Sequence, residues 1–234
     1  TEQGVRPVVS VVPEGEAGRL FLRYPVVRLI NERPWKDYIY RREDLAEFAG
    51  RHYSGQRNHI HKFRKLYPDA EYVPLTAADE PLLERFWQDY GAEFSKESAI
   101  AKNELRLAKE MLRHLAGDWF MAGGLLHEGR LVAISMGEQC GSTMQVHIEK
   151  ALYSYPGAYP TMVQEFARHC DDSVRWMNRE DDARDKGLRM SKMQYLPAAL
   201  GGKLCFEVGS ELDRLHEMPT LHSDRLTLDA LTEK

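Results

Sequence analysis

Cysteine is scarce in this sequence, and its few cysteines lie far apart. Cys140, Cys170 and Cys205 form no CxxC pair, so neither a structural zinc site nor a disulfide framework is predicted, and we expect no metal. Widely spaced single cysteines are typical of free thiols in a reducing compartment. No apolar run approaches the roughly 20 residues that a membrane-spanning helix needs. The N-terminus does not have the pattern of a signal peptide either, and we therefore expect a cytoplasmic protein without a membrane span.

The whole chain also has no large excess of positive or negative charge. The formal net charge is −4 over 234 residues, which excludes a polycation that binds nucleic acid over its entire surface. Any such site must be a local patch. With 43% hydrophobic and 29% charged residues, the composition is that of one large or two small globular domains with a substantial core.

The first third of the chain is predicted to hold short strands followed by helices. Residues 8–12 are predicted as a strand, 13–18 as a turn and 19–29 as a further strand. Helices are expected from 44 to 48 and from 54 to 67, the second with Ile60 and Phe63 on its inner face.

The remainder of the chain has an order of elements that points to one fold. Strands are predicted over 71–76, 118–126, 130–138, 143–150, 174–178 and 203–208, and helices over 78–94, 98–116, 161–170 and 186–195. This β-α-α-β-β-β-α-β-α-β order is that of the GNAT acyltransferase fold, with one final strand unassigned. We therefore predict an α+β or α/β fold, with a GNAT-like mixed, mostly antiparallel sheet flanked by helices.

Residues 51–65 (RHYSGQRNHIHKFRK) form a basic segment. It contains five Arg or Lys, three His and no acidic residue. Such a density of one charge favours an anion such as a phosphate of tRNA or coenzyme A. The alternative is a solvated helix face whose charges pair with acidic residues elsewhere.

The strand predicted at 143–150 alternates between apolar and polar residues. Gln145, His147 and Glu149 are expected to share one face. Because this strand is central in the GNAT order and helices cover both faces, such polar residues must line a cavity or be paired. A carboxylate beside an imidazole is a plausible general base, and a structural hydrogen-bond network is the alternative.

A turn with glycine and two prolines precedes the helix at 161. GNAT enzymes use the backbone N–H groups of this turn to bind the pyrophosphate of coenzyme A. Here only Gly157-Ala158 resembles that pattern, and Pro156 and Pro160 have no N–H to donate. A tight turn between strand and helix is the alternative interpretation.

Acidic residues cluster at the end of the strand at 174–178, and basic residues follow on a helix. The segment contains Asn178, Glu180 and Asp181, then Arg189 and Lys192. Carboxylates at the C-terminal edge of an α/β sheet often face a ligand, whereas internal ion pairing is the alternative.

Several stretches together resemble the phosphatidylglycerol lysyltransferase C-terminal-domain-like family. They occur in the family's order: Asp37-Tyr38-Ile39-Tyr40, Arg57-Asn58-His59-Ile60, His147-Ile148-Glu149-Lys150, Gly157-Ala158-Tyr159, Asn178-Arg179-Glu180-Asp181, and Lys192. The resemblance implies paired GNAT-like units. Residues 1–36 would be the remnant of a first unit, 37–69 linking helices with the basic patch, and 70–210 the second unit. Residues 211–234 would be either a polar tail or a linker into a further, fused acetyltransferase domain.

The resemblance also implies an activity. It points to transfer of an aminoacyl group from aminoacyl-tRNA to an amine or hydroxyl acceptor, a small molecule or a peptide, without a further cofactor. His147 and Glu149 would act on the acceptor. The other implied roles are substrate binding by Gln145, Tyr159, Asn178, Glu180 and Asp181, and phosphate or tRNA binding by Arg57, His59, Lys62, Arg64, Arg189 and Lys192. An acyl-CoA-dependent N-acetyltransferase and a non-catalytic tRNA-binding or regulatory module are the alternatives.

Overall fold

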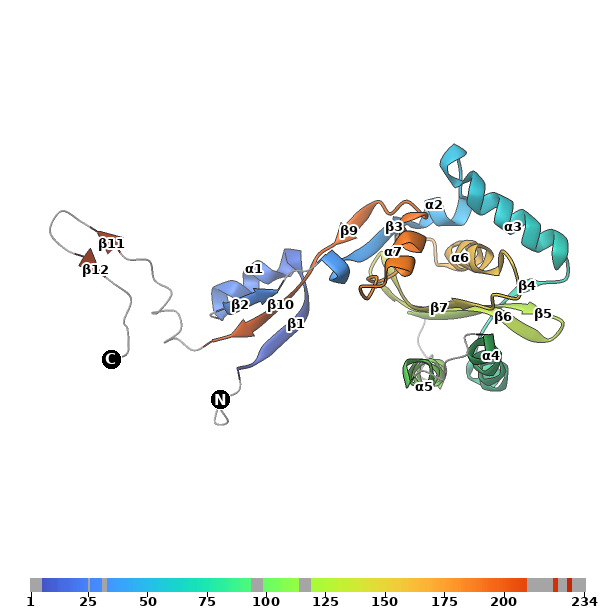
Figure 1. Cartoon of the computed structure of the whole chain (residues 1–234), viewed down its shortest axis with the longest axis horizontal. Helices are drawn as coiled ribbons and strands as arrows, with labels where there is room; N and C mark the ends of the chain where they lie inside the picture. The colour runs from blue at the N-terminus through green and yellow to red at the C-terminus, as the bar shows by residue number, and fades with distance from the viewer. Residues whose placement is uncertain are drawn as a thin grey trace. The chain divides into compact units, whose positions relative to one another are not determined.

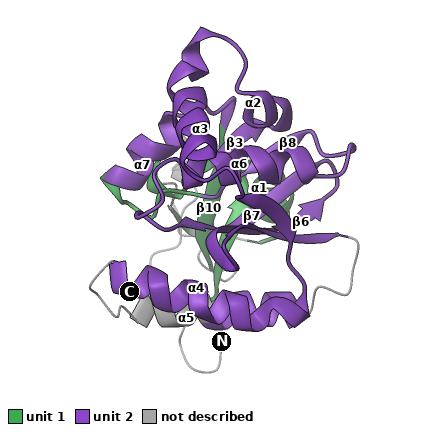
Figure 2. Cartoon of the chain, turned by 90° about the vertical axis from the view of Figure 1, so that its right-hand side faces the viewer, with its two compact units in different colours: residues 1–37, 181–186, 200–234 green, residues 38–180, 187–199 purple. Residues whose placement is uncertain are grey.

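The computed structural model describes residues 6–24, 26–30, 33–93, 99–113, 119–209, 221–222 and 227–228. The chain divides into two compact units (Figure 2). Unit 1 comprises residues 1–37, 181–186 and 200–234, and unit 2 comprises residues 38–180 and 187–199. None of the described helices is both long enough and apolar enough to cross a membrane.

A mixed sheet organises unit 2 (Figure 1). Its strand order is β4 (Glu71–Pro74), β5 (Phe120–His127), β6 (Arg130–Cys140), β7 (Thr143–Ala151), β8 (Trp176–Asn178), β3 (Asp37–Arg41) and β9 (Ala199–Gly201). Neighbours from β4 to β7 are antiparallel, β7 and β8 are parallel, and β8 and β3 are antiparallel. The predicted mostly antiparallel sheet is confirmed, and β7 is its middle strand. The two strands beyond β8, β3 and β9, are not among the predicted strands.

Helices cover both faces of this sheet, as the apolar periodicity predicts. On one face lie α2 (Arg42–Glu47), α3 (Ser54–Leu66) and α6 (Ala158–His169), and on the other α4 (Glu80–Glu93) and α5 (Ala99–Arg113). Two buried clusters result, one including Phe63 and Phe166 and the other including Leu83 and Leu112. The remaining helix of this region is α7 (Lys186–Met193), and short 3₁₀ turns are η1 (Arg33–Trp35), η2 (Arg51–Tyr53) and η3 (Ala77–Asp79).

The predicted domain boundary near residue 69 does not coincide with a boundary between the units. Tyr40 and Phe63 lie in the same buried cluster as Val146 and Phe166. Residues 38–69 therefore share the core of the sheet that follows them, because their apolar faces have no other core to join.

A bulge interrupts the alternation along β7. Gly137 of β6 is opposite Val146, and Met136 is opposite Ile148, so that His147 is the extra residue. Val146 packs in the cluster with α6, whereas Ile148 packs in the cluster with α4 and α5. An extra residue shifts all later side chains to the opposite face. The prediction that Gln145, His147 and Glu149 share a face is therefore wrong.

Unit 1 is built on a three-stranded antiparallel sheet. Its order is β1 (Val8–Pro13), β10 (Lys203–Val208) and β2 (Val26–Ile30), with α1 (Glu14–Arg23) packed on it. The turn predicted at 13–18 and the strand predicted at 19–29 are wrong over α1, because Ala17, Leu20 and Phe21 form one helical face beside Phe206. The strand predicted at 203–208 exists, but it pairs with β1 and β2 rather than in the larger sheet.

The C-terminal segment is described only in part. Strands β11 (Leu221–His222) and β12 (Thr227–Leu228) pair antiparallel. The rest of residues 210–234, where a linker or a further domain is predicted, lies outside the described residues.

Candidate functional site

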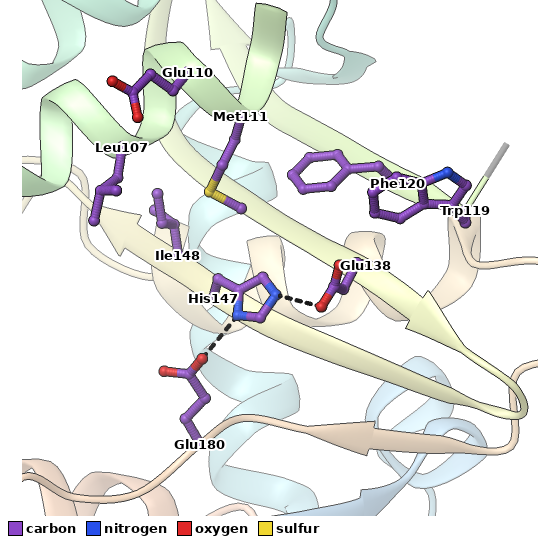
Figure 3. A pocket seen from close by; sticks show the side chains of 9 residues that line it. All are labelled: Leu107, Glu110, Met111, Trp119, Phe120, Glu138, His147, Ile148 and Glu180. Carbon is purple, nitrogen blue, oxygen red and sulfur yellow. Dashed lines mark hydrogen bonds and ion pairs between the residues drawn. The ribbon is translucent and has the colours of Figure 1, made fainter. Parts of the chain in front are cut away.

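A cavity of about 610 Å³ lies on the α5 side of the sheet in unit 2. Its lining comes from α5, from the start of β5, from β6 and β7, and from Glu180, which lies two residues after the end of β8 (Figure 3). The lining residues are Leu107, Glu110, Met111, Trp119, Phe120, Glu138, His147, Ile148 and Glu180. Leu107, Glu110 and Met111 come from α5, and the sheet places His147 between Glu138 and Glu180.

His147 is held between two carboxylates. Its Nδ1 lies 2.8 Å from Glu180 Oε1, and its Nε2 lies 3.4 Å from Glu138 Oε1. The hydrogen bond with Glu180 raises the pKa of His147 above its ordinary value, burial opposes the rise, and the charges of Glu180 and Glu138 add to it. The side chain remains 32% exposed, so that a ligand in the cavity can reach the ring.

The backbone explains how His147 and Glu180 meet. Strands β7 and β8 pair only as far as Gln145 and Asn178, and beyond that point β7 continues without β8 beside it. His147 faces the α5 side, and the bulge places Ile148 on the same side and Glu149 on the other. Glu180 adopts a left-handed backbone with φ of 56°. Asn178 Oδ1 accepts from Glu180 N at 2.8 Å, and Tyr38 N donates to Glu180 O at 3.1 Å. Left-handed non-glycine residues are uncommon and often occur at functional sites.

Glu149 lies on the opposite face and takes part in a buried ion pair. Its Oε2 accepts from Tyr159 Oη at 2.8 Å and from Arg179 Nε at 3.0 Å. The Arg179 side chain is 2% exposed, and its guanidinium also lies over the rings of Tyr40 and Tyr195. Glu149 and Tyr159 therefore stabilise the core beneath the site rather than line the cavity. The sequence pattern gives Arg179 no role of its own, although it stands between the predicted site residues Asn178 and Glu180.

The remaining predicted acidic and amide residues have different surroundings. Gln145 is half-buried in β7, and Asn178 supports the backbone of Glu180. Asp181 belongs to unit 1, where its Oδ2 accepts from Lys203 Nζ at 2.9 Å. Lys203 also contacts Asp37 Oδ1 at 2.7 Å. Asp181 thus does not join Glu180 in the cavity.

Two arginines of the basic segment are engaged in internal contacts. Arg57 Nη1 donates to the backbone oxygens of Phe48 and Gly50, at 2.6 Å in the second case. Arg64 Nη2 lies 2.7 Å from Glu165 Oε1. The alternative of internal pairing therefore applies to both.

The other predicted phosphate-binding residues divide between surface and core. His59 and Lys62 are exposed on α3, and neither has an ion pair within the part of the chain that the structure describes. Lys192 is only 7% exposed and donates from Nζ to the backbone oxygens of Arg179 and Glu180. Arg189 is half-buried on α7.

The N-terminus of α6 is occupied by the backbone of α3. Gly157 has φ of +90°, and a Cβ at this position would lie 2.3 Å from His59 O and 3.0 Å from Phe63 Cβ. The N–H of Ala158 already donates to Tyr155 O, the N–H of Thr161 donates to Gly157 O, and Pro160 has none. The glycine serves a close approach of two helices, and few donors remain for a pyrophosphate.

No cluster of metal-ligating side chains is present among the described residues. The chemistry available in the cavity is that of an imidazole with three carboxylates beside apolar groups. Such a site can accept and return a proton and can bind an ammonium group.

Comparisons with known proteins agree with the architecture. Residues 2–205 match the family described as phosphatidylglycerol lysyltransferase, C-terminal. A conserved protein of unknown function from Bacteroides thetaiotaomicron VPI-5482 is 30% identical, with a TM-score of 0.77 over 89% of this chain and 71% of that one. The C-terminal domain (DUF2156) of a protein described as a lysylphosphatidylglycerol synthetase from Agrobacterium fabrum is 10% identical, with a TM-score of 0.63 over 91% and 70%. No curated protein sequence matches the chain.

Proposed function

We propose that this chain, which belongs to the family of phosphatidylglycerol lysyltransferase C-terminal domains, transfers an aminoacyl group from aminoacyl-tRNA to an amine or hydroxyl acceptor. Its fold is of the acyltransferase type. The observation that carries the proposal is the position of His147 between Glu180 and Glu138 in the wall of a cavity. The cavity has room for a reacting group on the imidazole, and the carboxylates tune the basicity of the ring.

The proton path follows from the two ring nitrogens. Glu180 accepts the hydrogen bond from Nδ1–H at 2.8 Å, which leaves Nε2 as the proton acceptor. The acceptor amine or hydroxyl attacks the ester carbonyl carbon of aminoacyl-tRNA while His147 Nε2 takes its proton. When the tetrahedral intermediate collapses, the ester C–O bond breaks and His147 returns the proton to the departing ribose oxygen.

The remaining cavity residues suit a cationic group with an aliphatic stem. Glu138 and Glu110 line the cavity beside Leu107 and Met111, and Glu138 stands 3.4 Å from Nε2. An ammonium taken out of water needs compensating charge. Glu138 supplies it, whereas Glu110 is paired with Arg106 Nη1 at 2.7 Å. The ammonium belongs to the aminoacyl group or to the acceptor.

An aminoacyl-tRNA donor is favoured over acyl-CoA by the surroundings of α6. The approach of His59 O to Gly157 leaves little space where coenzyme A would place its pyrophosphate, and two of the N–H groups there are already bonded. The exposed side chains of His59 and Lys62 on α3 offer phosphate contacts instead.

The direct test uses a pool of tRNA charged with labelled amino acids. The purified chain is incubated with this pool and with a panel of acceptors that includes small amines, peptides and phosphatidylglycerol vesicles. We expect label to move from tRNA to one class of acceptor. In a parallel experiment, acetyl-CoA replaces the charged tRNA with the same acceptors. Transfer of an acetyl group from acetyl-CoA, without transfer from tRNA, would show that the chain is an N-acetyltransferase. Binding of tRNA without transfer to any acceptor would establish the non-catalytic module.

A further inference from the structure

A second cavity in unit 2 gathers arginine side chains that the proposed reaction does not use. Its volume is about 650 Å³. It is lined by Arg41, Arg42, Glu43, Ala46, Glu47, Arg168, Val174, Arg175 and Trp176, which come from the ends of β3, α2 and α6 and from the start of β8. We refer to it as the arginine cavity.

Two arginines of the arginine cavity carry charges that no carboxylate among the described residues pairs with. Arg41 and Arg175 have no carboxylate partner within the part of the chain that the structure describes. Arg42 Nη2 lies 3.9 Å from an oxygen of Asp172, whose side chain is fully exposed, so that pair is weak. Arg168 Nη1 lies 3.5 Å from Glu165 Oε1. Arg41 and Arg175 are therefore the arginines of the lining without an ion pair among the described residues, and Glu43 and Glu47 also line the cavity.

Folding alone does not account for this gathering. Arg41 and Arg42 stand at the start of α2, where a cation is electrostatically unfavourable. Arg168 has an evident structural contact, because its Nε donates to Ala46 O at 2.8 Å, but no such contact holds the side chain of Arg175 among the described residues. Like charges held close together in a recess are costly unless an anion binds among them.

An aromatic ring lies among the arginines. Trp176 is half-buried, and the guanidinium of Arg41 stands 5.6 Å from the centre of its ring. Guanidinium groups bind phosphate through paired N–H donors, and an aromatic ring stacks on a nucleobase. The combination of both groups in a recess fits a nucleotide strand better than a flat anionic surface.

We propose that the arginine cavity binds the phosphodiester backbone of RNA, with a base against Trp176. The inference does not depend on the transfer reaction, because an RNA strand binds there whether or not it carries an aminoacyl group. The proposal also places the main RNA contact at the start of β8 and the end of α6 rather than on α3.

The test measures binding of deacylated tRNA and of a single-stranded oligoribonucleotide by fluorescence anisotropy across a salt series. The variant Arg41→Ala/Arg175→Ala is compared with Arg19→Ala/Arg85→Ala, which removes the same charge from exposed positions elsewhere. We expect the first variant to lose about tenfold or more in affinity and the log–log salt slope to fall by roughly 0.7 to 0.9 per lost contact. Equal affinity and slope in the two variants would overturn the proposal.

Two further arms separate RNA from other sources of phosphate. Trp176→Ala should weaken binding of the oligoribonucleotide and leave binding of tripolyphosphate unchanged. A thermal melt confirms that the variant is folded. Tripolyphosphate that competes as well as RNA would assign the cavity to a free phosphate anion instead. Arginine-dependent binding to phosphatidylglycerol vesicles without RNA binding would assign it to a membrane surface. Both outcomes contradict the proposal.

Discussion

His147 Nδ1 and Glu180 Oε1 lie 2.8 Å apart although 33 residues separate them in the sequence. The contact forms where β7 and β8 stop pairing, and it depends on a bulge in one strand and a left-handed residue after the other. It makes the imidazole a stronger base than an isolated histidine. The predictions below follow from this contact and from the packing beneath it.

Removing the Glu180 charge should lower the pKa of His147. The hydrogen bond that His147 donates to Glu180 is the largest cause of the raised pKa, so Glu180→Gln should bring it closer to the ordinary value. NMR titration of the imidazole protons measures the change. Glu138→Gln is the matched variant and should give a smaller fall, because its charge is a lesser cause. Equal shifts in both variants would contradict the assignment of Glu180 as the main partner.

The same contact should make stability depend on pH with a defined sign. The pKa of His147 is raised in the folded state, so the folded protein binds a proton more tightly than the unfolded chain. The stabilisation is complete below the unfolded pKa of about 6.5 and is lost as the pH rises through the folded pKa. Urea unfolding of the wild type and Glu180→Gln should therefore differ more at pH 6 than at pH 9. A difference that grows toward pH 9 would contradict the account.

Breaking the buried ion pair should be costly. Arg179→Leu leaves the carboxylate of Glu149 without its partner in the core, and we expect a loss of about 3–5 kcal/mol in the free energy of unfolding. Replacing both residues, in Arg179→Leu/Glu149→Leu, should recover part of that loss. Chemical denaturation measures all three proteins. A double variant no more stable than Arg179→Leu would show that the pair does not act as a unit.

Gly157 should tolerate no side chain. Its φ of +90° and the 2.3 Å approach of His59 O to the Cβ position mean that Gly157→Ala both strains the backbone and separates α3 from α6. We expect a loss of more than 1 kcal/mol in the free energy of unfolding. Gly55→Ala on α3, where nothing lies near the Cβ position, is the control and should be neutral or slightly stabilising.

Acetyl-CoA should bind weakly for the same structural reason. The occupied N-terminus of α6 offers few free donors, so we predict a dissociation constant of about 1 mM or weaker. Isothermal titration calorimetry measures it. Micromolar binding would favour the N-acetyltransferase over the aminoacyltransferase.

Most of the sheet could be predicted from periodicity, because each strand and helix buries a repeating apolar face. The helix α1 was mistaken for turn and strand because its apolar residues, such as Leu20 and Phe21, are few and follow a turn-like Pro-Glu-Gly sequence. The pairing of β10 with β1 and β2 depends on contacts between distant segments, which a local pattern does not specify.

The site was only partly predictable. The polar residues of β7 were located correctly, but the bulge that sends His147 and Glu149 to opposite faces is set by the pairing with β6. The sequence predicts one cluster from Asn178 to Asp181, but each residue has different surroundings. Asn178 supports the backbone of Glu180, and Arg179 forms a buried ion pair. Glu180 lines the cavity, and Asp181 belongs to unit 1. Glu138 had no distinguishing pattern of its own.

The central claim is that His147 accepts the proton of the attacking group during aminoacyl transfer. The most direct measurement is the single-turnover rate of transfer from labelled aminoacyl-tRNA by the wild type and by His147→Gln, each saturated with tRNA. The account predicts a rate about 10²–10⁴ times lower in the variant, with tRNA affinity little changed and a cooperative thermal melt that shows the variant is folded. A variant that transfers within a few-fold of the wild-type rate would contradict it.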